Sequence, residues 1–215
     1  MTKLSEDSLA MHEASVSHYQ SHLGQAEAYL AARGIDSSAA NTYRLGVVPL
    51  EGDLPLPEHD EYRGRLVIPY LTEGGIVNMK FRCLKDHSCK EVKHAKYTGL
   101  PGRNNLYNVR ALFDASETLA VCEGELDALV LSVSGVPSVG IPGATAVQKH
   151  YRYIFADFTR IVVFTDGDEA GKKLGATLRE QVGAIPVRLP EGRDVTDMIV
   201  GGELEWLTDR LNSKR

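Results

Sequence analysis

Three carboxylates directly follow short apolar runs, in a pattern that can hold metal ions. Glu123 follows LAVC, and Asp166 and Asp168 follow RIVVFT. Residues two apart in an extended segment point the same way, so both aspartates can face one ion, and Gly167 lets the backbone approach closely. Hard divalent cations prefer carboxylate oxygens, and Mg²⁺ also binds substrate phosphates. The pattern therefore predicts a phosphoryl-transfer site.

The elements that must position these acids are predicted from residue 116 onward. Apolar runs such as LAVCEG, VPSVGIPG and AIPVRLPEG alternate with helical patterns such as LDALVLSVSG and KKLGATLREQVG. Such alternation indicates an α/β fold with a parallel sheet flanked by helices, whose functional groups lie at the carboxyl ends of the strands. We therefore expect the acids to gather at one sheet edge.

The preceding residues predict a smaller mixed α+β subdomain. Residues 15–33 are rich in helix formers and end before a glycine, and a second short helix is expected from Ser37. RLVIPYL and IVNMKFRCL are β-rich runs separated by TEGG, which predicts a hairpin. We accordingly divide the chain into a basic, template-binding subdomain of residues 1–115 and a metal-binding catalytic domain of residues 116–215.

Charge is unevenly distributed along the chain. The net charge is −5, yet residues 62–110 carry 10 basic and 3 acidic side chains, between two acidic segments. A basic block beside acidic ones is expected if one surface holds a polyanion and another holds metal ions. The alternative is that the block is only a solvated, loop-rich face.

Composition excludes several classes of protein. The chain has 215 residues, 43% of them hydrophobic, and no apolar stretch long enough to span a membrane. Its N-terminus is polar, unlike a signal peptide, and its 3 cysteines argue against a disulfide framework. The sequence predicts a soluble, cytoplasmic protein without a membrane partner.

A second group of ligand-type residues lies in the basic segment. Cys83, His87, Cys89 and His94 offer four sulfur and nitrogen ligands that could bind zinc. Their spacing is not the paired-knuckle pattern typical of zinc modules, and the alternative is that they are ordinary polar groups of a loop. Cys122 follows an apolar run and is expected to be a buried small hydrophobe.

EGELDAL, VPSVGIPG and VVFTDGDEAGKK, in this order, resemble the toprim family. The resemblance implies that Glu123 performs acid/base work and that Asp166 and Asp168 hold Mg²⁺ or Mn²⁺, with Asp127 matching a further family position. Gly140, Gly143 and Gly171 also match. Toprim domains occur in topoisomerases, nucleases and recombination proteins as well, so this resemblance alone does not name a reaction.

Further segments are similar to the catalytic cores of bacterial replicative DNA primases, most closely the compact phage-encoded type. They are YLAARGIDSSAANTYRLGVVP, YRGRLVIPYLTEGGIVNMKFRCL, KYTGLPGRNNLYNV and LPEGRDVTDMI, and the resemblance spans about residues 25–205. It implies that Arg65, Arg82, Lys96 and, as a looser match, Arg103 contact template or nucleotide phosphates. Asp194 would be a further metal ligand. Thr196 stands where a second aspartate is usual, and Asp197 is a substitute one position away.

The resemblance implies a nucleotidyltransferase of DNA replication that makes short RNA primers on a single-stranded DNA template from ribonucleoside triphosphates. Catalysis would rest on Glu123, Asp166 and Asp168. The zinc-binding and helicase-binding domains of full-length primases have no counterpart here, so a replicative helicase or a separate zinc-domain protein is an expected partner, in a bacterial host cell if the chain is phage-encoded. The alternatives are a toprim-type nuclease and a catalytically inactive nucleic-acid-binding subunit.

Overall fold

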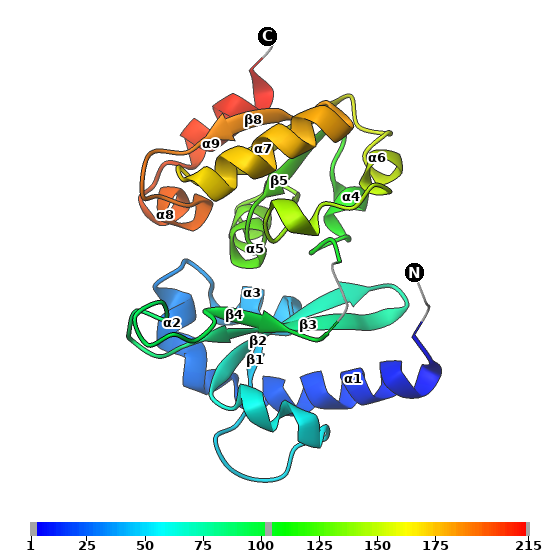
Figure 1. Ribbon diagram of the computed structural model, residues 1–215, viewed down its shortest axis with the longest axis vertical. Helices are drawn as coiled ribbons and strands as arrows, with labels where there is room; N and C mark the ends of the chain where they lie inside the picture. Colours follow the sequence, from blue (N-terminus) through cyan, green and yellow to red (C-terminus); the bar gives the residue numbers. More distant parts are fainter. Residues whose placement is uncertain (1–3, 102–104, 214–215) are drawn as a thin grey trace. The chain divides into compact units, whose positions relative to one another are not determined.

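The computed structural model describes residues 4–101 and 105–213. The chain divides into two compact units, Met1–Arg103 and Asn104–Arg215 (Figure 1). The boundary expected from the sequence lies later, at residue 115. Residues 105–115 join the second unit because Leu106 and Ala111 pack into its core, and Tyr107 pairs with Gly140 in an isolated bridge.

The first unit is built on an antiparallel sheet in the order β1-β2-β3-β4. Its strands are β1 (Gly46–Val47), β2 (Arg65–Thr72), β3 (Gly75–Cys83) and β4 (Tyr97–Gly99). β2 and β3 form the predicted hairpin, in which Thr72 pairs with Gly75. Gly75 has a φ of +111°, a conformation that a residue with a Cβ rarely adopts, so the turn needs its glycine.

The first unit also contains short and long helices. They are α1 (Glu6–Gln20), η1 (Leu23–Ala26), α2 (Glu27–Ala31), α3 (Ser37–Thr42) and η2 (Pro57–Tyr62). Of these, α1 and η1 pack against the sheet. α1 lies along one face of the sheet in Figure 1, with Val16 and Tyr19 in a core shared with Val67 and Phe81.

The single helix expected over residues 15–33 is wrong. α1 begins earlier, at a cap in which the Ser5 side chain accepts from the amide of Ser8, and it ends at Gln20. The Ser21 hydroxyl donates to the carbonyl of His18, and Gly24 is a weak helix former, so the chain turns before α2 begins.

The second unit contains a parallel sheet in the order β6-β5-β7-β8, which confirms the predicted α/β class. Its strands are β5 (Thr118–Cys122), β6 (Ser138–Gly140), β7 (Arg160–Thr165) and β8 (Ile185–Arg188). β5 and β7, the two central strands, are almost entirely buried. The near-continuous apolar runs in the sequence are therefore explained by burial on both sheet faces.

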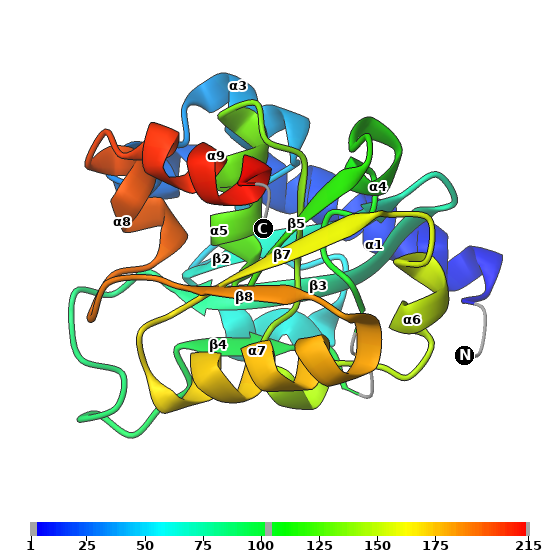
Figure 2. The same cartoon turned by 90° about the horizontal axis from the view of Figure 1, so that it is seen from above.

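Helices cover both faces of the parallel sheet. Seen from above, α7 lies on one side of it, whereas α5, α8 and α9 lie on the other (Figure 2). Their bounds, with those of the shorter helices, are α4 (Ala111–Asp114), α5 (Glu125–Val133), η3 (Ala144–Ala146), α6 (Tyr151–Ile154), α7 (Glu169–Val182), α8 (Val195–Val200) and α9 (Leu204–Asn212). Leu174 and Leu178 of α7 are one helical turn apart, and both pack into the core that this helix shares with the sheet.

Within the described residues, no helix has both the length and the apolar character needed to cross a membrane.

Candidate functional site

The predicted acids lie at the carboxyl ends of neighbouring strands of the second unit. β5 and β7 pair in parallel with Cys122 opposite Phe164, so Glu123 and Asp166 follow adjacent strands at nearly the same level. Asp168 is the N-cap residue of α7, and Asp194, which follows β8, is the N-cap residue of α8. The sheet therefore brings four acids from distant parts of the sequence to one edge, which we call the acidic edge: Glu123, Asp166, Asp168 and Asp194.

Gly171 permits the close approach of α7 to this edge. A Cβ at Gly171 would lie 2.4 Å from the carbonyl oxygen of Asp166 and 3.0 Å from Oε2 of Glu123. A contact of 2.4 Å with backbone is far inside van der Waals distance, so only glycine fits without displacing the helix. The first turn of α7 and the two acids are thus packed directly against one another.

Two of the acids also cap helices. Oδ1 of Asp168 accepts a hydrogen bond of 2.8 Å from the amide of Gly171. Oδ1 of Asp194 accepts one of 2.7 Å from the amide of Asp197, whose own Oδ2 accepts from the amide of Asp194. These caps fix each carboxylate through one oxygen. The side chain of Asp197 serves as the other half of this capping box.

Asp127 connects two helices. Its Oδ1 accepts hydrogen bonds from the amide and the hydroxyl of Thr196, at 3.0 and 2.7 Å, and so links the start of α5 to the start of α8. The threonine that stands where the primase pattern has an aspartate is therefore a hydrogen-bond donor to Asp127. Sequence reasoning missed this pairing, because residues 69 positions apart carry no local signal of their contact.

Burial and electrostatic repulsion raise the pKa values of two carboxylates of the acidic edge, Asp166 and Glu123. Burial raises the pKa of Asp166 to about 7, with further contributions from the negative charges of Glu123, Asp127, Asp194 and Asp168. Burial also raises the pKa of Glu123, although a backbone hydrogen bond from Asp166 partly opposes it. Among the described residues, Oε2 of Glu123 is buried without a hydrogen-bond partner. A divalent cation would reduce the repulsion between these carboxylates and would give the buried oxygen a partner.

The predicted phosphate-binding residues lie in the first unit. Arg82 is buried, donates to the hydroxyl of Tyr97, and lies with its guanidinium carbon 5.2 and 4.8 Å from the ring centroids of Tyr29 and Tyr97. Arg65 donates to the carbonyl of Ala95 at 3.0 Å. Lys96 is exposed. Arg103 lies outside the described residues, so its expected role has no structural counterpart here.

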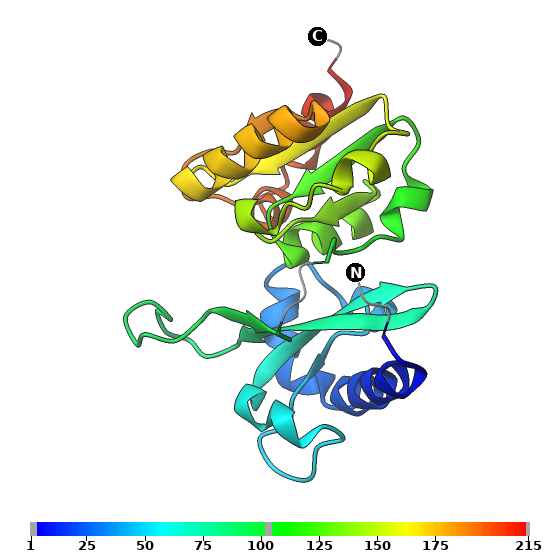
Figure 3. The same ribbon diagram turned by 45° about the vertical axis from the view of Figure 1, so that its right-hand side comes forward.

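A cavity of about 740 Å³ in the first unit gathers further cations. The segment between β3 and β4, residues 84–96, forms much of its wall, and in Figure 3 this segment extends away from the sheet. Of the arginines and lysines that line the cavity, sequence reasoning named Arg82 and Lys96 as phosphate-binding candidates. It did not single out the other three, which are Arg33, Lys85 and Lys90.

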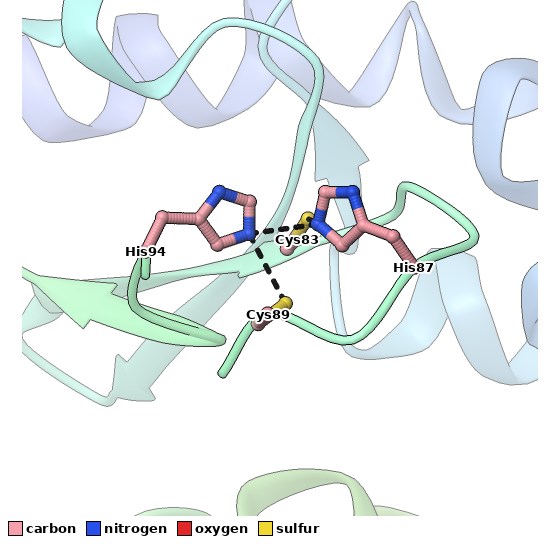
Figure 4. A group of neighbouring side chains, drawn as sticks. All are labelled: Cys83, His87, Cys89 and His94. Carbon is pink, nitrogen blue, oxygen red and sulfur yellow. Dashed lines mark hydrogen bonds between the residues drawn. The ribbon is translucent and has the colours of Figure 1, made fainter. Parts of the chain in front are cut away.

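The four sulfur and nitrogen ligands of this segment converge (Figure 4). Nε2 of His87 lies 3.6 Å from Sγ of Cys83 and 2.9 Å from Nε2 of His94, which is 3.1 Å from Sγ of Cys89. All four ligand atoms lie within 4.8 Å of one another. Over the described residues, this is the one group of three or more such side chains that meets at a single point.

Comparison with known protein families finds a match that lies within the second unit. A family model described as Toprim-like matches residues 120–199, which include the strands and helices around the acidic edge. The fold and the acids thus define a toprim-type domain joined to an antiparallel α+β unit.

The chain is also similar to two known proteins in sequence and to a solved structure in fold. Gene 57 protein of Mycobacterium phage D29 is 32% identical over 152 residues, covering 70% of this chain and 99% of that protein. DNA primase of Buchnera aphidicola is 25% identical over 125 residues, covering 53% of this chain but 21% of that primase. The RNA polymerase domain of Mycobacterium tuberculosis primase DnaG, solved in complex with double-stranded DNA, matches with a TM-score of 0.78 at 21% identity, over 96% of this chain and 80% of that one.

The chain belongs to the same family as Gene 57 protein of Mycobacterium phage D29, contains a Toprim-like domain, and shares the fold of a bacterial primase core. Its parallel sheet flanked by helices and its antiparallel sheet give the fold class that the resemblance implies.

Proposed function

We propose that the chain is a DNA primase, which synthesises short RNA primers on single-stranded DNA by metal-dependent nucleotidyl transfer from ribonucleoside triphosphates. The observation that carries this proposal is the acidic edge within a primase-core fold. Glu123 and Asp166 follow adjacent strands, and mutual repulsion and burial raise the pKa values of both. Perturbed carboxylates gathered at the carboxyl edge of a parallel sheet are characteristic of a catalytic site.

The residues present fit a divalent ion. The acidic edge offers hard oxygen donors, and Oε2 of Glu123 is buried without a partner among the described residues. Asp166, Asp168 and Asp194, with Glu123, would hold Mg²⁺ or Mn²⁺. When bound there, the ion would supply positive charge to the phosphates of the incoming nucleotide.

We assign Glu123 the role of general base, because it follows a central strand at the acidic edge and its pKa is raised. In the proposed reaction it accepts the proton of the attacking 3′-hydroxyl. The hydroxyl oxygen bonds to the α-phosphorus of the incoming ribonucleotide, and the bond from that phosphorus to pyrophosphate breaks. Burial raises the pKa of Glu123, which improves its ability to take up a proton.

The first unit supplies cations for the sugar-phosphate backbone. We assign Arg65, Arg82, Lys96 and Arg103 to template or nucleotide phosphates, because residues 62–110 carry a strong positive excess and the cavity of this unit is lined by arginine and lysine. Contacts of this kind supply affinity without sequence preference and allow movement along a strand. The guanidinium carbon of Arg82 lies 5.2 and 4.8 Å from the ring centroids of Tyr29 and Tyr97, and these contacts hold the charged group in place.

The proposed setting is DNA replication in the cytoplasm of a bacterial cell. The Buchnera primase is much longer than its region of similarity to this chain, so the activities of that whole protein do not transfer. We propose a replicative helicase or a separate zinc-domain protein as the partner that selects start sites.

The test is primer synthesis on single-stranded DNA with labelled ribonucleotides and Mg²⁺ or Mn²⁺. Wild type is compared with Asp166→Ala/Asp168→Ala and with Asp157→Ala, which removes an exposed aspartate outside the acidic edge. We expect short labelled products from wild type and from Asp157→Ala, and none from the double variant. Cleavage of the template in place of primer synthesis would identify a nuclease. An intact template without product, in the presence of a helicase and a zinc-domain protein, would identify a binding subunit.

A further inference from the structure

The segment between β3 and β4 has little apolar packing to hold its shape. Residues 84–96 are mostly polar and charged, and Val92 is 53% exposed. Its base is closed by the sheet, where the amide of Cys83 donates to the carbonyl of Lys96 at 2.9 Å. Long connections without regular structure are uncommon in compact units unless something else orders them. The feature at the centre of this segment is the Cys/His cluster.

Four atoms that can each donate a lone pair point at one another in this cluster (Figure 4). Cys83 is anchored at the end of β3, whereas His87, Cys89 and His94 lie on the connecting segment. The turn that returns the chain is held by the amides of Glu91 and Val92, which donate to the carbonyl of Ser88, and by the amide of His94, which donates to the carbonyl of Cys89. Local backbone bonds thus bring the ligands from separate positions to one point.

The spacing of the ligand atoms suits zinc. Zinc bonds of about 2.3 Å to sulfur and about 2.0 Å to nitrogen place tetrahedral ligands roughly 3.3–3.8 Å apart. The measured separations of 2.9, 3.1 and 3.6 Å, with all four atoms within 4.8 Å, scatter around these values. Two thiolates and two neutral imidazoles form the donor set of a closed structural zinc site.

We propose that Cys83, His87, Cys89 and His94 bind one structural zinc ion, which orders residues 84–96 and thereby the wall of the basic cavity. Two thiolates cancel the charge of Zn²⁺, so the neighbouring Lys85, Lys90 and Lys96 oppose the ion little. This site uses other residues and other ligand types than the acidic edge. It lies within the first unit, and the proposal does not depend on the proposed catalytic activity.

The first experiment measures zinc content in untagged full-length protein produced with zinc and purified under reducing conditions. We expect about one zinc ion per chain in wild type and in Asp166→Ala/Asp168→Ala, and loss of zinc in Cys83→Ser/Cys89→Ser. Cys122→Ala and His150→Ala are matched controls that keep the ion, because Cys122 is buried in the second unit and His150 is exposed there. Cobalt substitution should give the absorption bands of tetrahedral thiolate coordination, which the double cysteine variant lacks.

Limited proteolysis of the wild-type protein tests the proposal even if the double cysteine variant does not fold. Lys85, Lys90, Lys93 and Lys96 are trypsin sites within the ordered segment, so chelation of wild type should speed cleavage there by about tenfold or more. Zinc should restore protection, and Mg²⁺ should not. Wild type that contains no zinc, whether with three free thiols or with a Cys83–Cys89 disulfide, would overturn the proposal. Retention of zinc by Cys83→Ser/Cys89→Ser would overturn it as well.

Discussion

The two candidate metal clusters of this chain are built in opposite ways. The acidic edge stands on a rigid parallel sheet, with Glu123 and Asp166 fixed by neighbouring buried strands. The Cys/His cluster stands on an irregular segment, yet in the described part of the chain it is the group whose ligand atoms converge.

The difference follows from what each site must do. A structural zinc site is closed, because four protein ligands complete its shell and the ion itself holds the fold. A phosphoryl-transfer site must leave room for substrate phosphates and water, so its carboxylates are spread along an edge, and two of them are fixed by helix caps. A convergent cluster is therefore better evidence of a structural ion than of catalysis. A spread of repelling acids on a rigid sheet is what an open site requires.

The largest expected effect is on catalysis. Glu123→Gln removes the proposed base while keeping its shape, and primer synthesis should fall by about 10²–10⁴-fold. Rates of primer synthesis check this, with Glu117→Gln, an exposed glutamate just before β5, as the control that retains activity. An unchanged rate in Glu123→Gln would remove general-base catalysis from the acidic edge.

Gly171→Ala should disturb the acidic edge through its scaffold. The added methyl group would meet the carbonyl oxygen of Asp166 at 2.4 Å, so α7 must shift, at a cost of about 1–3 kcal/mol in the free energy of unfolding. Urea unfolding and primer synthesis should both be impaired. Gly24→Ala adds the same group where nothing lies within 4 Å, and it should leave both unchanged. Equal effects of the two substitutions would contradict the close packing.

Asp166→Asn should stabilise the metal-free protein in a pH-dependent way. Because the pKa of Asp166 rises from 3.8 unfolded to about 7 folded, the wild-type carboxyl costs stability increasingly as pH rises between these values. The melting temperature of the variant should exceed that of wild type by a few degrees above about pH 7, and the gap should close near pH 4. Thermal denaturation in chelator checks this, and a gap that persists at acidic pH would contradict the electrostatic cause.

The smallest expected effect concerns template binding. Lys96→Ala removes one exposed cation from the wall of the basic cavity. Affinity for single-stranded DNA should fall modestly for every sequence, and the slope of log affinity against log salt should decrease by about 0.7. Lys149→Ala, an exposed lysine of the second unit, is the control. A loss of affinity confined to one template sequence would contradict a phosphate contact.

The sequence predicted those parts of the molecule that local patterns determine. Alternating apolar runs gave the parallel sheet, and TEGG gave the hairpin that the structure contains. The helix over residues 15–33 failed, because helix-forming composition continues past Ser21 and Gly24 although the backbone turns there. Helix propensity summed over a window of many residues does not detect a turn at one or two positions.

Tertiary contacts account for what sequence reasoning missed at the sites. The acids were found because each follows a strand, but the bond from Thr196 to Asp127 depends on how α8 packs against α5. The four cysteine and histidine ligands converge because the chain turns at Ser88, and their spacing does not match a zinc motif from which this turn could be predicted. The cavity cations come from the turn after α2, from β3 and from the connecting segment, and only folding brings them together. The functional assignments of the site residues themselves stay predictions.

Manganese binding tests the central claim most directly. Free Mn²⁺ is measured by electron paramagnetic resonance during titration of wild type, Asp166→Asn/Asp168→Asn and Cys83→Ser/Cys89→Ser, each checked for folding by circular dichroism. Our account predicts saturable Mn²⁺ binding by wild type and by the cysteine variant, and its loss in the aspartate variant. Binding that survives in the aspartate variant, or that disappears only in the cysteine variant, would show that the acidic edge does not hold the divalent ion.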